Sequence, residues 1–298
     1  MSRRAERPLT HRTLFEGPGF SVSDYRCHAC RGGPLPEEYV EHHTIVLLRH
    51  GVYQKHVGRE SVTLDTNQAA FFTKEREYRV SHPADCGDRG TVFTPSPEAL
   101  GDILGEIEPA YAERQHRPFP FLNGPCDPQT FWTHRQIVRQ LESLNGLPAD
   151  PLWLEESSLA LMSDVLTAAF ERAGSPRSKK REETIANHID RAEAVKSNLA
   201  SRVGAQICLE EIAQSVELSP FHMARIFRSH TGITVHRYRT QLRMRAALER
   251  LAAGADDLTE LALDLGYSSH SHFTDTFRRE FGAPPSELRR ILSTNPEA

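Results

Sequence analysis

The sequence has no long hydrophobic run, no large excess of one charge and few cysteines. No stretch approaches the roughly 18 apolar residues of a membrane-spanning helix, since Arg49 soon interrupts the run 45–48. Residues 1–20 carry arginines with no apolar segment behind them, so we expect no secretory signal. Five cysteines in 298 residues is an odd, low number that predicts a reducing compartment rather than a disulfide framework. We therefore expect a cytoplasmic protein with no membrane partner.

Signatures of catalysis and nucleotide binding are missing as well. The sequence contains no ordered Ser/His/Asp set, no phosphate loop and no glycine-rich nucleotide fingerprint. The adjacent carboxylates Glu155 and Glu156 lie beside an apolar helical stripe, which is typical of a surface. We expect no catalytic residues, no cofactor and no enzyme activity. With 38% hydrophobic and 26% charged residues, the chain can build real cores, and its length suits two domains.

The first third of the chain has the pattern of short β-strands. Segments rich in Val, Ile, Thr, Phe and Tyr alternate with turn-forming Gly, Asp and Asn. Six such segments at this spacing predict a small antiparallel barrel or sandwich. The predicted strands are residues 43–49, 52–57, 61–64, 69–73, 78–81 and 91–94.

From residue 98 onward the periodicity is helical. A small, polar, charged stretch at 174–183 divides the helices into two groups and predicts an exposed linker. The predicted helices are 98–113, 128–144 and 151–173 before the linker, then 184–200, 208–216, 219–230, 234–253, 258–265, 269–281 and 284–292 after it.

The helix 151–173 carries an apolar stripe that needs a partner surface. The stripe runs from Leu152 through Leu159 and Val165 to Phe170. It must pack either on its own barrel or on a second copy of the chain. Both alternatives stay open, and the second makes this segment the candidate interface of a homodimer.

The C-terminal part contains an internal repeat. The segment LEEIAQSVELS at 209–219 recurs as LTELALDLGYS at 258–268, and the match continues to Arg239 and Arg289 after one inserted residue. Each copy predicts a short apolar helix, a tight turn and a second helix opened by a serine cap. This is the pattern of a helix-turn-helix, whose second helix can enter the major groove of DNA.

The helical period separates a buried face from an outward face in both second helices. Met223, Ile226 and Phe227 form the inward stripe of the first copy. Phe273, Thr276, Phe277 and Phe281 form that of the second. The outward positions, which we take as candidates for reading bases, are Phe221, His222, Ala224 and Arg225 in the first copy and His270, Ser271, Thr274 and Asp275 in the second.

The helix 234–253 is long enough, at about 30 Å, to hold the two copies one DNA turn apart. Between residues 219 and 245 there are six arginines and no acidic residue, which makes a local charge of +6 that favours DNA phosphate. The candidates for phosphate contact are Arg228, Arg239, Arg243, Arg278 and Arg279.

The last hundred or so residues resemble the AraC/XylS-type transcription regulator domain. The motifs that carry the resemblance lie at 218–228, at Thr231-Gly232, at 265–273 and from 276 to 289. The first 115 or so residues resemble the cupin-like sensor barrel that is often fused to that domain, on strand pattern alone. The resemblance implies double-stranded promoter DNA as partner, together with a small-molecule effector, a homodimer and contact with RNA polymerase.

Carried over by position, the resemblance places Phe221, Ala224 and Arg225 against bases, with Arg225 able to fork onto guanine. His222 is as consistent with packing or capping as with a DNA contact. Asp275 departs from the family pattern, in which an arginine is frequent at this position. An aspartate only accepts hydrogen bonds, so it either receives one from cytosine or tethers Arg278 or Arg279. In the second case the second copy mainly positions the protein on phosphates.

Histidines and cysteines in the first half do not complete a metal site by sequence. The adjacent His42 and His43 point to opposite faces of a strand, so both cannot bind one ion. Cys27 and Cys30 have the spacing of a zinc or redox pair, but no second pair follows. We predict no metal site, and the residues that bind an effector stay unknown.

Taken together, the sequence predicts an α+β protein. Residues 1–173 form a cupin-like β-barrel sensor with a helical dimerisation segment, 174–183 the linker, and 184–298 an all-α DNA-binding domain of two helix-turn-helix units joined by a long helix. The predicted function is a sequence-specific transcription regulator, an activator that responds to a small molecule. The alternatives are a cupin-type metalloenzyme with a DNA-binding tail and a cysteine-based redox-responsive regulator.

Overall fold

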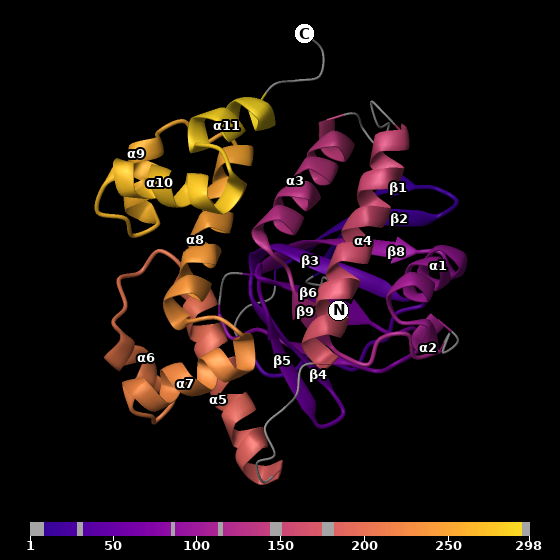
Figure 1. Cartoon of the computed structure of the whole chain (residues 1–298), viewed down its shortest axis with the longest axis horizontal. Helices are drawn as coiled ribbons and strands as arrows, with labels where there is room; N and C mark the ends of the chain where they lie inside the picture. The colour runs from indigo at the N-terminus through magenta and orange to yellow at the C-terminus, as the bar shows by residue number, and fades with distance from the viewer. Residues whose placement is uncertain are drawn as a thin grey trace, which may run out of the picture.

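The computed structural model describes residues 9–28, 32–84, 87–112, 116–143, 151–174 and 182–293. Most of the predicted linker 174–183 lies outside these ranges. The strands and helices of the first half lie on one side of the molecule and the helices of the second half on the other (Figure 1). No helix in the described ranges is long and apolar enough to cross a membrane.

The described strands all pair antiparallel and form two sheets. The larger sheet has the order β1-β2-β8-β3-β6-β9, and the smaller has the order β5-β4-β7. β3 and β6 are buried almost throughout, because helices cover one side of the larger sheet and the smaller sheet lies on the other. The strands are β1 (Leu9–Glu16), β2 (Phe20–Cys27), β3 (Thr44–Gly51), β4 (Tyr53–Val57), β5 (Glu60–Leu64), β6 (Gln68–Phe72), β7 (Arg79–Ser81), β8 (Asp88–Pro95) and β9 (Asn123–Pro125).

The sequence prediction missed β1, β2 and β9. β1 is an edge strand whose side chains are mostly exposed, so it lacks the alternation of apolar and polar residues that marks a half-buried strand. The side chains of β2 do alternate in burial, but the strand contains Ser and Asp, which are not typical strand residues, so its sequence does not read as a strand. β9 has the sequence Asn-Gly-Pro, which is typical of a turn, and it pairs with β6 only because of tertiary packing.

The helices described in the first half are α1 (Pro97–Ile107), α2 (Pro109–Ala112), α3 (Pro128–Ser143) and α4 (Pro151–Gly174). The predicted helix 98–113 is broken after α1, because Pro109 cannot continue the hydrogen-bond ladder of a helix. In α4 the apolar stripe packs on the chain's own core, where Met162, Val165 and Leu166 are all buried. Leu152 alone among the large apolar residues of the stripe is strongly exposed, at 72%.

In the described part of the second half the helices lie close to the predicted bounds: α5 (Glu182–Ser201), α6 (Leu209–Ser215), α7 (Pro220–Thr231), α8 (Val235–Ala252), α9 (Leu258–Asp264), α10 (His270–Phe281) and α11 (Pro285–Ser293). We call α6–α7 the first unit and α9–α10 the second unit. The hydroxyls of Ser219 and Ser269 cap α7 and α10 by accepting from the third amide after each. Gly232 and Gly282 end the same helices with left-handed φ angles of +83° and +80°.

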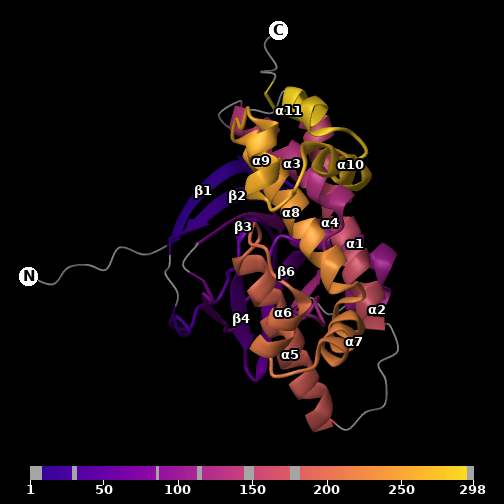
Figure 2. The same ribbon diagram turned by 90° about the vertical axis from the view of Figure 1, so that its left-hand side faces the viewer.

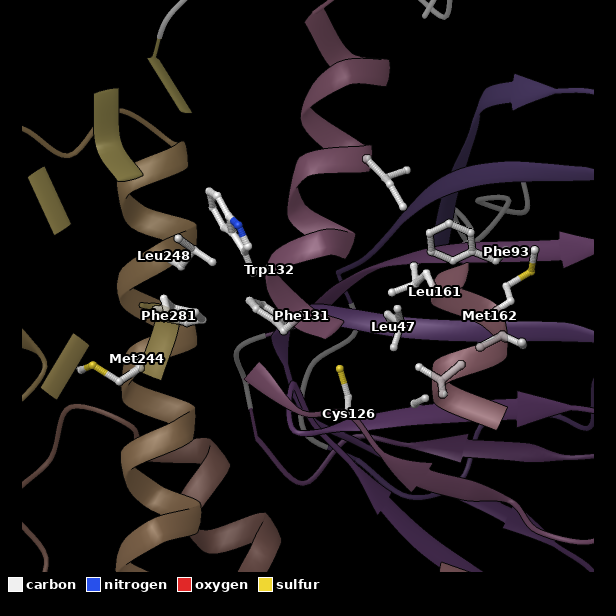
Figure 3. Close-up of a cluster of buried hydrophobic side chains, with 14 of the residues drawn as sticks. Leu47, Phe93, Cys126, Phe131, Trp132, Leu161, Met162, Met244, Leu248 and Phe281 are labelled. Atoms are coloured by element: carbon white, nitrogen blue, oxygen red, sulfur yellow. The ribbon is translucent and has the colours of Figure 1, made fainter. Parts of the chain in front are cut away.

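The two halves share their hydrophobic interior. Phe131 and Trp132 of α3 point toward Leu248 of α8 and Phe281 of α10, and Met244 belongs to the same cluster (Figure 3). A separate cluster joins Val52, beside β4, to the interior of the first unit. The sensor half therefore packs on α8 and on both helix-turn-helix units.

Candidate nucleic-acid interface

The two units lie at opposite ends of α8, on the side of the molecule away from the larger sheet (Figures 1 and 2). α8 has 18 residues, which at 1.5 Å per residue gives a rod of about 27 Å. This length approaches the rise of about 34 Å for one turn of B-form DNA. The length of α8 is therefore of the order that two units in successive major-groove segments require.

In the first unit the helical period predicted the faces of α7 correctly. Met223, Ile226 and Phe227 are buried. The Phe221 side chain is 80% exposed to solvent, which is unusual for a large apolar ring. Arg225 is also exposed, and among the described residues no acceptor contacts its guanidinium. An aromatic ring and an arginine at i and i+4 share one face of the helix.

The other two candidate base-reading residues of α7 are less exposed to solvent. Ala224 is half-buried. His222 is half-buried too, and its ring packs edge-on against His188 of α5 with 5.6 Å between ring centroids. The structure thus favours the packing alternative for His222 over projection into a groove.

In the second unit Phe273, Thr276 and Phe277 of α10 are buried as predicted. The outward positions His270, Ser271 and Asp275 are exposed, while Thr274 is half-buried. Thr276 lies inward because its hydroxyl donates to the carbonyl of His272 one turn earlier.

Asp275 does not tether the neighbouring arginines through its carboxylate. The contact between Arg279 and Asp275 is a 3.4 Å hydrogen bond from the guanidinium to the backbone carbonyl. Among the described residues no cation pairs with the Asp275 carboxylate, which leaves it exposed as a free acceptor. This outcome favours the first of the two sequence alternatives, acceptance from a base.

The candidates for phosphate contact divide into two groups. Arg228, Arg278 and Arg279 are exposed. Arg243 is only 9% exposed, and its guanidinium donates to the carbonyls of Val203, Ala205 and Gly266. Three carbonyls thus occupy its donors, and its assignment as a phosphate contact stays a prediction. Arg239 is half-buried and is likewise bound to the carbonyls of Ala205 and Ile207.

The local charge of +6 is therefore weaker at the surface than the sequence implies. Arg245 is 0% exposed and points into the sensor half, where it donates to the carbonyls of Thr66 and Cys126. Arg237 pairs with Glu280 at 2.6 Å. Helix geometry explains part of this, since Arg239 and Arg243 are four residues apart and share one face of α8, whereas Arg245, two residues further on, lies on another face.

A hollow of about 470 Å³ lies between α8 and the second unit. His236 and Thr240 of α8 line it, as do His272 and Arg279 of α10. These side chains donate hydrogen bonds or carry positive charge, so the hollow suits a phosphate backbone that passes from one groove to the next. Sequence reasoning missed His236 and Thr240, although their spacing of four residues on α8 was a usable signal.

Where the two halves meet, Glu193 of α5 lies in a buried polar network. Its carboxylate is 2.9 Å from the Lys196 ammonium and 2.6 Å from Nε2 of His230 in α7, and it accepts from the Thr63 amide of β5. Lys196 also donates to the Thr63 carbonyl at 2.6 Å. Burial raises the pKa of Glu193, but Lys196 and His230 outweigh it and hold the pKa at about 2.

A second polar contact fixes α8 to the turn between β5 and β6. The Tyr238 hydroxyl donates to the Asp65 carboxylate at 2.6 Å, and the Asn67 side-chain amide donates to the Tyr238 carbonyl at 3.2 Å. Burial raises the pKa of Asp65 and of Tyr238. These contacts join residues some 170 positions apart, so no local sequence signal announces them.

Comparison with known proteins connects these features. The profile of a family described as "Helix-turn-helix domain" matches residues 212–291, which span both units and α8. The chain is 24% identical over 258 residues to "HTH-type transcriptional activator RhaS" of Escherichia fergusonii, covering 87% of this chain and 88% of that protein. The RhaS protein of Salmonella arizonae is 24% identical over 263 residues, with 88% and 90% covered.

The chain contains a helix-turn-helix domain and is similar to AraC/XylS-type transcription regulators along most of its length.

Among solved structures, this regulator aligns with an apo form of a ToxT variant from Vibrio cholerae at 13% identity and a TM-score of 0.41, over 94% of this chain and 100% of that one. An AraC-type regulator from Chromobacterium violaceum aligns with 37% of this chain and 97% of its own at 24% identity and a TM-score of 0.34. The family match covers the C-terminal pair of helix-turn-helix units, and an antiparallel sheet domain precedes them.

Proposed function

We propose that this regulator binds promoter DNA with α7 and α10 in two successive major-groove segments on one face of the duplex. The observation that carries the proposal is the exposed pair Phe221 and Arg225 on α7, held by one rigid helix relative to the matching face of α10. Residues 184–298 act as the DNA-binding domain, residues 1–173 as the sensor, and 174–183 as the linker between them.

Within the interface we assign base contact to Arg225 and Phe221 in the first unit and to Ser271 and Asp275 in the second. Arg225 supplies two parallel donors to guanine, and Phe221 supplies apolar contact with a thymine methyl. Phosphate contact falls to Arg228, Arg278 and Arg279, which are the exposed members of the predicted set.

The sensor acts on DNA binding by thermodynamic linkage. A small effector that binds the sensor more tightly in one arrangement of the two halves shifts the molecule toward that arrangement. Support comes from the contacts of α5 and α8 with the sensor at Thr63 and Asp65, and from the hydrogen bond that Arg172 of α4 donates to the His230 carbonyl of α7. Because the RhaS relatives are named transcriptional activators, we assign activation, with RNA polymerase as the protein partner on DNA.

Association of two copies, in the cytoplasm, is part of the proposal. The intramolecular burial of the α4 stripe leaves Leu152, at 72% exposure, as its free apolar position. A Leu152→Glu variant should sediment as a monomer where the unmodified chain is a dimer, whereas Glu156→Gln on the same helix should leave the mass unchanged. An unchanged mass in the first variant contradicts the assignment of this surface.

The proposed function is tested by mapping the bound sites across the genome and measuring affinity for the operator so found. Arg225→Ala should weaken that operator by about 1–3 kcal/mol and leave non-specific DNA nearly unaffected, because it removes a base contact. The matched control is Arg59→Ala, which removes the same charge from an exposed turn of the sensor. Equal loss on both DNAs would make Arg225 a phosphate contact, and no loss on either would remove α7 from the interface.

A further inference from the structure

Three potential metal ligands converge inside the sensor half. Sγ of Cys27 lies 3.5 Å from Nε2 of His82, and that same nitrogen lies 2.8 Å from a carboxylate oxygen of Asp88. All three ligand atoms lie within 4.8 Å of one another. The three residues are 7%, 3% and 4% exposed, so the cluster is closed off from bulk water.

The strands bring these residues together from three separate segments. Cys27 ends β2 and Asp88 begins β8, and the two are direct partners in the antiparallel ladder. His82 follows β7 of the smaller sheet and bridges Gly32. The cluster therefore joins the larger sheet to the smaller one.

The backbone around the cluster is arranged for close approach. Gly87 and Gly51 both have left-handed φ angles, of +59° and +85°. A Cβ atom at Gly87 would lie 2.4 Å from the Cys27 carbonyl oxygen, and one at Gly51 would lie 2.1 Å from the Gly87 carbonyl oxygen. Only glycine allows both the φ angle and the contact, so the segment that delivers Asp88 is fitted tightly against the end of β2.

The geometry suits a shared cation better than a proton relay. A relay through imidazole uses one ring nitrogen toward each partner, whereas Cys27 and Asp88 both face Nε2 of His82. Tetrahedral zinc with bonds of about 2.3 Å to sulfur and 2.0 Å to nitrogen separates those two atoms by about 3.5 Å, as observed for Cys27 and His82. The nitrogen-to-oxygen separation needs about 3.3 Å, which asks the Asp88 carboxylate to withdraw by about 0.5 Å.

A fourth polar group lies beside the cluster. The hydroxyl of Tyr25, two residues before Cys27, is buried within hydrogen-bonding reach of the Asp88 carboxylate.

We propose that Cys27, His82 and Asp88 form a binding site for one divalent transition-metal ion, and that their thiolate, imidazole and carboxylate donors select zinc. The set of donors is the kind that tetrahedral zinc takes in proteins, and the oxygen-rich coordination that magnesium and calcium prefer is lacking here. The ion would tie the two sheets together close to the first unit, since Val52 and Ala84 of neighbouring segments pack on that unit's core.

The test measures zinc uptake by the full-length protein after treatment with a chelator. Zinc should bind at one ion per chain in competition with a chromophoric chelator, and cobalt in its place should show a thiolate-to-cobalt charge-transfer band. Cys27→Ser and His82→Gln should each lower zinc affinity more than about tenfold, and Cys27→Ser should also abolish that band, because it removes the thiolate. Cys30 and Cys86, which lie outside the described residues, stay unchanged in all variants.

Two controls keep the result interpretable. Cys208→Ser removes an exposed cysteine elsewhere, and His56→Gln removes a histidine from β4 that bonds to Ser81, so both should bind zinc as the unmodified chain does. Circular dichroism identifies any variant that has lost its fold, and the isosteric Cys27→Ser is then decisive. Absence of stoichiometric binding, or equal affinity in Cys27→Ser and the unmodified chain, overturns the proposal. Neither result bears on DNA binding, which is measured separately.

Discussion

Among single residues, Lys55 of β4 is a cation held where water does not reach. Its ammonium nitrogen donates to the Phe71 carbonyl at 2.6 Å and lies 3.6 Å from the centre of the Phe72 ring. Burial, with a smaller contribution from Arg76, lowers the pKa of Lys55 from 10.5 to about 7. Between those two pH values the unfolded chain binds more protons than the folded one, so the free energy of unfolding rises with pH.

We expect the free energy of unfolding to rise by at most about 1.4 kcal/mol per pH unit above pH 7, and this rise to disappear in Lys55→Met. Urea unfolding at pH 7 and pH 9 measures it. Lys74→Met serves as control, because that side chain is 49% exposed and pairs only at the surface with Glu75. The expectation fails if Lys55→Met keeps the pH dependence of the unmodified chain.

At the scale of helices, the ends of α7 and α10 are set by glycine. Gly232 and Gly282 both have left-handed φ angles, and a Cβ atom at either position would meet nothing within 4 Å. The cost of alanine there is thus backbone strain alone, and we expect Gly232→Ala and Gly282→Ala each to lower the free energy of unfolding by about 1 kcal/mol. For Gly105, in the last turn of α1, we expect alanine to have the opposite effect on stability.

Gly105→Ala should raise the free energy of unfolding by about 0.5–1 kcal/mol, because Gly105 lies within a helix, is exposed and also has open space at its Cβ position. Thermal and urea unfolding of the three variants measure this contrast in sign. A loss of stability in Gly105→Ala, or none in the cap variants, contradicts the assignment of Gly232 and Gly282 as conformational caps.

Across the whole molecule, Glu193 connects the sensor to the DNA-binding half. Glu193→Gln leaves the Lys196 ammonium buried without its anion, which should cost about 3–5 kcal/mol of stability and loosen β5 from α5 and α7. The matched control Glu211→Gln breaks an exposed pair with Arg202 and should cost at most about 1 kcal/mol. Urea unfolding checks both values, and equal small losses would contradict a structural role for the network.

Acid titration gives an independent measure of the same network. The folded-state pKa of Glu193, about 2, lies below its ordinary value of 4.5. The stability it contributes is therefore fully present above pH 4.5 and is lost as the pH falls toward 2. The unmodified chain should lose more stability than Glu193→Gln across this window, and parallel acid profiles of the two would count against the network.

The repeat made the second half predictable from sequence. Ser219 and Ser269 begin their helices, Gly232 and Gly282 end them, and the period of Met223 and Phe227 separates the faces of α7, all through local interactions. Phe221 and Arg225 were found in the same way, because exposure on an isolated helix follows from its period.

Predictions that depended on contacts between segments far apart in the sequence were less accurate. Arg243 and Arg245 carry the same charge as Arg225, yet their donors go to carbonyls of the chain. The sequence of the α4 stripe could not show whether the stripe packs on the core of the same chain or on a second copy. In the structure Val165 and Leu166 pack in the core of the same chain. Cys27, His82 and Asp88 come from three separate segments, and only the pairing of β2 with β8 and the packing of the two sheets bring them together.

The sequence by itself determined where the helices begin and end, which of their faces are apolar, and that two of them form a repeated DNA-binding unit. Those features rest on interactions within one or two helical turns, which a linear pattern records. Tertiary structure decided which arginines remain free for DNA, how the sensor meets α5, α7 and α8, and which polar side chains meet inside the sheets. These depend on burial and on pairing between remote segments, which exist only once the chain has folded.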